Sequence, residues 1–127
     1  MNKNWQQVKL FHQTFNQPHQ NKPVLLERER VEKRIMWMQE EIGEFADAQT
    51  IAAQADAMID LIYFALGTLV EMGVSPDGLF DIVQAANMAK LWPDGQPHYN
   101  EHKKVIKPPD WQTPDKKIED EIMRQSL

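Results

Sequence analysis

Two predicted helical segments of this chain carry closely spaced acidic residues. The first contains the pattern Glu40-Glu41-x-x-Glu44, and the second contains Asp56 and Asp60, one helical turn apart. An unpaired buried carboxylate is very costly, so such groups are paired with a cation, protonated or bound to a metal ion. The surrounding stretches MWMQEEIGEF and MIDLIYFALGTLV contain no Lys, Arg or His. The pattern therefore favours a divalent-cation site with Glu41, Glu44, Asp56 and Asp60 as ligands.

The apolar surroundings of these acids strengthen that interpretation. The stretch from Met58 to Val70 is apolar nearly all round, which is typical of a buried helix, and Asp60 is its only charged residue. Glu41 falls inside the broad apolar arc of the preceding helix. Three alternatives stay open: a solvated acidic face, a protonated Asp60 in a core, or an ion pair between subunits. The last would involve Arg28, Arg30 or Arg34.

Composition bounds the class of protein. A chain of 127 residues is expected to form a single domain, 1–127. The net charge of −5 argues against nucleic acid or an anionic membrane as partner. There is no cysteine, so thiolate metal sites are excluded. The N-terminus does not resemble a signal peptide, and the longest apolar run is too short to span a bilayer. We expect a cytoplasmic protein.

Periodicity and capping residues predict an all-α fold. Thr50 is a plausible N-cap and Gly73 a plausible C-terminal stop, whereas Pro23 suits a first helical position. Ser75-Pro76-Asp77 marks a restart. We expect a helical bundle of four main helices, a Pro-rich C-terminal segment with a short hairpin at 98–106, and a short last helix. The expected helices are 4–15, 23–49, 51–72, about 76–90 and 114–125.

An oxygen-only ligand set selects a hard cation. Mg²⁺ is the first expectation and Mn²⁺ the second, whereas zinc is disfavoured without His or Cys. Mg²⁺ held by a few carboxylates keeps positions for water and substrate phosphates, which suggests phosphoryl chemistry. A spare carboxylate outside the metal's immediate ligands could act as general base. A di-iron bundle would need Glu-x-x-His pairs, and no histidine of the chain follows a glutamate at that spacing.

The acidic pattern with Asp60 on the next helix resembles the all-α NTP pyrophosphatases, the MazG-like enzymes. The run 55–63, the segment Asn87-Met88-Ala89-Lys90 and the segment 104–108 are similar to the phosphoribosyl-ATP pyrophosphohydrolase-like subgroup. The resemblance covers about residues 5–113. It implies Mg²⁺-dependent hydrolysis of a nucleoside triphosphate between the α and β phosphates, which yields the monophosphate and pyrophosphate. In that mechanism Glu40 orients or deprotonates the attacking water.

One position departs from the family pattern. The second family motif is Glu-x-x-Asp, and Ala57 occupies the position three residues before Asp60. We expect Asp56 to replace the missing ligand, or else metal binding to be weaker. A non-catalytic helical protein that senses nucleotides or binds a partner through a degenerate site is therefore the alternative function.

Cationic and polar residues after the acidic helices are candidates for substrate binding. The resemblance places Lys90 near the acids, with Asn87 one turn before it. Lys104 and Lys107 are the further candidates, with ordinary solvated lysines as the alternative for both. Because the two acidic helices have wide apolar arcs and family members assemble, we also expect a homodimer or homotetramer.

Overall fold

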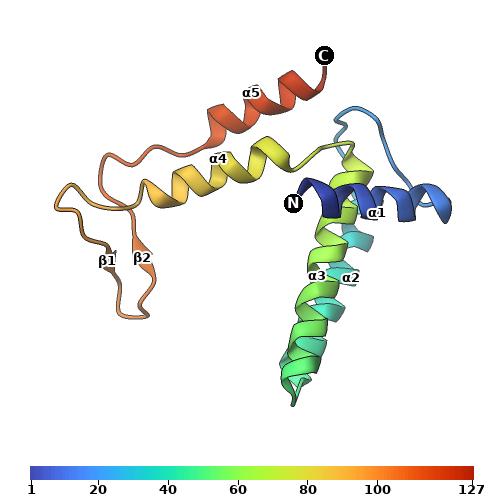
Figure 1. The fold of residues 1–127 in the computed structure, drawn as a ribbon, viewed down its shortest axis with the longest axis horizontal. Coiled ribbons are helices and arrows are strands. Elements are labelled where there is room, and N and C mark those ends of the chain that lie inside the picture. The colour runs from blue at the N-terminus through green and yellow to red at the C-terminus, as the bar shows by residue number, and fades with distance from the viewer. The chain divides into compact units, whose positions relative to one another are not determined.

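The computed structural model describes all residues, 1–127, and confirms the all-α class (Figure 1). Helices account for 61% of the chain, and the sheet has only two short strands. The chain forms two compact units, residues 1–76 with Ser126 and residues 77–125 with Leu127. The expectation of a single 1–127 domain stays a prediction. No helix combines the length and the apolar character needed to cross a membrane.

The first unit contains the acidic residues and is built from α1 (Asn2–Thr14), α2 (Arg28–Asp47) and α3 (Ile51–Met72). Helices α2 and α3 form an antiparallel hairpin, and α1 crosses α3 near its C-terminal end (Figure 1). The connection between α2 and α3 is three residues long. Such a short connection forces the two acidic helices to lie side by side, which is what positions the site.

The ends of α3 are as the sequence predicts. The Thr50 side chain accepts a hydrogen bond of 3.0 Å from the Ala53 N–H, so it caps the first turn. Gly73 ends the helix in the left-handed conformation, with φ +70°. A Cβ atom at Gly73 would lie 2.2 Å from the carbonyl oxygen of Lys22, so only glycine fits there.

The prediction that α2 begins at Pro23 is wrong. The helix begins at Arg28, and Glu27 is its extended N-cap residue. The Val24 N–H donates to the carbonyl oxygen of Met72 at 2.8 Å. This bond satisfies a free carbonyl at the end of α3 and keeps the segment after Pro23 extended. The segment is thus used to close the end of α3 instead of lengthening α2.

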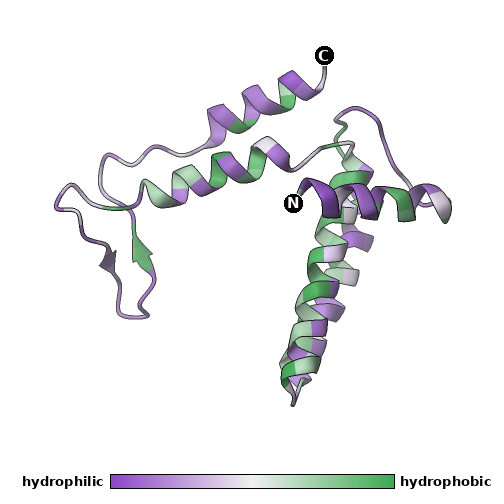
Figure 2. Cartoon of the chain, viewed as in Figure 1, coloured by the Kyte–Doolittle hydropathy of each residue, from purple (hydrophilic) through white to green (hydrophobic).

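The buried core of the first unit lies between α1 and the C-terminal half of α3. Trp5 and Val8 of α1 pack against Leu66 and Val70 of α3. The expectation that α3 is buried throughout is wrong for the chain by itself, since Ile59 and Ile62 remain exposed. Figure 2 shows the mainly apolar colouring of α3. The reason is that α2 and α1 cover only part of its circumference.

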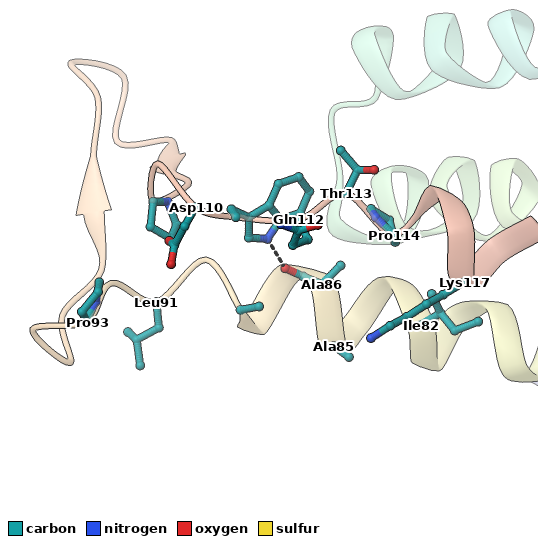
Figure 3. A pocket seen from close by; sticks show the side chains of 13 residues that line it. Ile82, Ala85, Ala86, Leu91, Pro93, Asp110, Gln112, Thr113, Pro114 and Lys117 are labelled. Atoms are coloured by element: carbon teal, nitrogen blue, oxygen red, sulfur yellow. Dashed lines mark hydrogen bonds between the residues drawn. The ribbon is translucent and has the colours of Figure 1, made fainter.

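The second unit contains α4 (Asp77–Met88), strands β1 (His98–Tyr99) and β2 (Val105–Ile106), and α5 (Asp115–Gln125). The hairpin and the last helix are as predicted, and β1 pairs antiparallel with β2. The fourth helix ends at Met88, two residues before the predicted Lys90, because its last turn tightens: the Lys90 N–H donates to the Asn87 carbonyl. The Trp111 indole N–H donates to the Ala86 carbonyl at 2.8 Å, which pins the Pro-rich segment to α4 beside a pocket of about 370 Å³ (Figure 3).

Candidate metal centre

Three of the predicted metal ligands converge in the α2–α3 hairpin. Glu41 and Glu44 lie one helical turn apart on α2, and Asp60 lies on α3. One carboxylate oxygen from each lies within 4.8 Å of the others. Glu41 and Asp60 are half-buried, whereas Glu44 is exposed. The group therefore has one solvent-accessible side, as a site that admits a substrate requires.

The charges in this group repel one another. Burial and the neighbouring carboxylates of Glu44, Asp60 and Asp56 raise the pKa of Glu41 to about 7. Burial and the charges of Asp56 and Glu44 likewise raise the pKa of Asp60. A carboxyl group with a raised pKa indicates that negative charge at this place lacks compensation. A divalent cation would provide it.

The nearby arginines do not neutralise the group, because they are engaged elsewhere. Arg34 donates from Nε to Glu71 at 2.8 Å, and both side chains are almost fully buried. Arg30 donates to the same carboxylate, and Arg28 pairs with Glu32 at the surface. Arg30 and Arg34 already pair with Glu71 of the same chain. They are therefore not available to form ion pairs with the acids of another subunit.

Sequence reasoning missed Glu71 as the partner of these arginines. Burial opposes ionisation of Glu71, but hydrogen bonds from Arg30 and Arg34 outweigh burial and hold its pKa below the usual range. A signal was available, since Glu71 lies in the last turn of α3. A glutamate there opposes the helix dipole, so its presence suggests a cationic partner.

Two other predicted site residues lie on these helices but outside the convergent group. Glu40 is exposed on α2, next to Glu41 in sequence. Asp56 is exposed on α3 and is not one of the three carboxylates that lie within 4.8 Å of one another. Its charge still contributes to the raised pKa of Asp60. Ala57, at the position that departs from the family pattern, is buried.

The residues present fit a hard divalent cation. The donor set consists of carboxylate oxygens alone, which suits Mg²⁺ or Mn²⁺. The Oε2 atom of Glu41 is buried without a hydrogen-bond partner. A buried charged oxygen that lacks a partner is costly, and binding a cation would remove that cost.

The four predicted substrate-binding residues all lie in the second unit. Lys90 and Lys107 converge on one aromatic ring, with their Nζ atoms 5.5 Å and 5.0 Å from the centre of Trp111. Lys104 is exposed just before β2, and Asn87 is exposed at the end of α4. The structure thus brings two of the four together.

Comparison with known proteins identifies relatives of this chain. The model of the phosphoribosyl-ATP pyrophosphohydrolase family matches residues 8–87, which include α2 and α3 with all of the acids. Among solved structures, the chain is similar to a crystal structure of a protein provisionally described as an NTP pyrophosphohydrolase, from Exiguobacterium sp. 255-15. The two are 34% identical, the match covers 96% of this chain and 95% of the other, and the TM-score is 0.53. No match was found among the curated proteins.

Proposed function

The chain belongs to the phosphoribosyl-ATP pyrophosphohydrolase family and is a pyrophosphohydrolase enzyme, and from this premise we propose that it acts on nucleoside triphosphates with Mg²⁺. Water would attack the α-phosphorus, and the bond from that phosphorus to the bridging oxygen would break. The products would be a nucleoside monophosphate and pyrophosphate. The substrate could be a ribo- or a deoxyribonucleotide.

One observation carries the choice of Mg²⁺ chemistry. Glu41, Glu44 and Asp60 bring their carboxylate oxygens within 4.8 Å of one another, and no Lys, Arg or His pairs with them. When bound there, Mg²⁺ would supply charge neutralisation for phosphate oxygens. Asp56, whose charge acts on Asp60, is proposed as the further ligand that replaces the residue missing at Ala57.

Glu40 is proposed as the general base. It lies beside Glu41 in sequence but is exposed. Its carboxylate would accept a proton from the attacking water. Mg²⁺ binding would leave the Glu40 carboxylate free, because Glu40 is not one of the three convergent carboxylates.

Lys90, Lys104, Lys107 and Asn87 are proposed to bind the substrate. A triphosphate is strongly anionic, and charge-assisted hydrogen bonds from lysine to phosphate oxygens stabilise such a ligand. Lys90 and Lys107 are the stronger candidates, because both already gather at Trp111.

We also propose that the enzyme is a homodimer or homotetramer. Ile59 and Ile62 of α3 and Ile42 and Phe45 of α2 are exposed in the single chain, with 40–60% of each side chain accessible. Contiguous exposed apolar residues mark interaction surfaces. Light scattering coupled to gel filtration tests this proposal, and a monomer at micromolar concentration would contradict it.

The proposed reaction is tested by a pyrophosphate-release screen of all NTPs and dNTPs with Mg²⁺. We expect turnover of at least one nucleotide, with loss of turnover when EDTA is added. Absence of pyrophosphate with every nucleotide would overturn the proposed substrate class.

A further inference from the structure

A cavity in the first unit lies one helical turn from the acidic group. It has a volume of about 210 Å³, and aromatic rings from three helices form much of its wall. Three polar residues, His12, Gln17 and Arg34, also line it. The aromatic residues are Phe11, Trp37, Tyr63 and Phe64.

The position of the cavity follows from helix geometry. Trp37 precedes Glu41 by four residues on α2, and Phe64 follows Asp60 by four residues on α3. Four residues correspond to about 6 Å along a helix. Because α2 and α3 are antiparallel, both steps lead in the same direction from the acidic group. A ligand that binds the acids through its phosphates and extends along the hairpin in this direction would reach the cavity with its other end.

The aromatic rings are arranged to hold a flat group. Trp37 and Phe64 lie with their ring centres 6.0 Å apart and an angle of 28° between the ring planes. Tyr63 contacts Phe11 edge to face at 5.8 Å. Arg34 lies over the Trp37 ring, 5.2 Å from its centre, and so fixes that ring from one side.

Two of the polar residues of the cavity, His12 and Arg34, are held in place and almost fully buried. Arg34 is 4% exposed and His12 is 3% exposed. Arg34 is anchored by Glu71 through Nε, and the His12 Nδ1–H donates to the Pro18 carbonyl at 2.7 Å. Burial lowers the pKa of His12, so at neutral pH its Nε2 is an acceptor. The cavity thus offers the N–H groups of Arg34 and an acceptor, as the edge of a nucleobase requires.

We propose that this cavity binds the base of the nucleotide substrate, with the ring against Trp37 and Phe64 and a polar base edge toward Arg34 and His12. The proposal rests on the nucleotide chemistry proposed for the acidic group. It makes the base itself a source of affinity. A polyphosphate without a base would lose that contribution and should be a much poorer substrate.

The test compares nucleotides with a probe that has no base. Trp37→Leu should raise KM for the preferred nucleoside triphosphate about tenfold, the loss expected for one base-stacking ring, and leave turnover of inorganic tripolyphosphate unchanged. Phe80→Leu is the matched control, because Phe80 is an exposed aromatic residue of α4 that does not line the cavity. It should change KM less than twofold.

A binding measurement separates this proposal from the proposed reaction. In EDTA, a nucleoside monophosphate should quench tryptophan fluorescence of the wild type, whereas Trp37→Leu and Phe64→Leu should bind it about tenfold more weakly. Equal binding by wild type and both variants would overturn the base site, even if the enzyme releases pyrophosphate. Base-dependent binding without any pyrophosphate release would overturn the reaction and leave the base site standing.

Discussion

Glu41 and Asp60 come from different helices, yet each brings a carboxylate oxygen within 4.8 Å of the other. Such proximity of like charges is unfavourable unless a proton or a cation intervenes. In the free protein the raised pKa of Glu41, about 7, indicates the proton. In the working enzyme we propose the cation.

Asp60→Asn should abolish activity and leave the helical fold intact, because the substitution removes a charged ligand and keeps the shape of the side chain. The metal-free variant should be more stable than the metal-free wild type, since repulsion from Asp56 and Glu44 disappears. Assays of pyrophosphate release and thermal unfolding in EDTA measure both effects. Asp81→Asn, an exposed acid on α4, is the control, and retained activity in Asp60→Asn would refute the metal assignment.

Glu40 and Glu41 should respond differently to the same substitution. Glu40→Gln should lower kcat by about 10²–10⁴, the range for a general base, with little change in Mg²⁺ affinity. Glu41→Gln should weaken metal binding instead, because it removes one of the convergent oxygens. Calorimetric titration with Mn²⁺ distinguishes the two, and the reverse order of effects would exchange their roles.

Asp56 is the proposed ligand that lies outside the three convergent carboxylates, and Ala57 provides the means to test it. Asp56→Ala should weaken Mg²⁺ binding about as much as Glu44→Ala does. Adding Ala57→Glu to Asp56→Ala should recover part of the activity, since it restores the family pattern on α3, although buried Ala57 must make room. If Asp56→Ala binds Mg²⁺ like the wild type, the three convergent carboxylates suffice.

Glu71→Gln should destabilise the first unit by about 3 kcal/mol, the scale for breaking a buried ion pair, because it leaves Arg34 buried without its counter-charge. The folded-state pKa of Glu71 is depressed, so its contribution is complete above the unfolded value of about 4.3 and is lost as the pH falls through the folded pKa. Urea unfolding of wild type and variant should therefore differ at pH 7 and converge in acid.

The control for this effect is Glu32→Gln. Glu32 pairs with Arg28 at the surface, where both side chains are exposed. Such a pair contributes only about 0–1 kcal/mol. Equal destabilisation by Glu32→Gln and Glu71→Gln would contradict the role assigned to the buried pair.

The sequence sufficed for elements whose signals are local. The cap at Thr50 and the stop at Gly73 define α3 to the residue, and the spacing of Glu41, Glu44 and Asp60 anticipates their convergence. Contacts between distant segments were not predictable. Pro23 looked like a helix start because nothing local reveals that the Val24 N–H pairs with Met72. The aromatic cavity could not be predicted from the sequence for the same reason. His12 and Trp37 come to line one cavity only through tertiary packing.

In the proposed reaction the acidic group directs water to the α-phosphorus of a nucleoside triphosphate in the presence of Mg²⁺. Its most direct test is hydrolysis in ¹⁸O-labelled water, followed by mass spectrometry of both products. We predict one ¹⁸O atom in the nucleoside monophosphate and none in pyrophosphate, with no reaction in EDTA or in Asp60→Asn. Label in pyrophosphate, release of a nucleoside diphosphate and phosphate, or undiminished turnover in EDTA would contradict the proposed reaction.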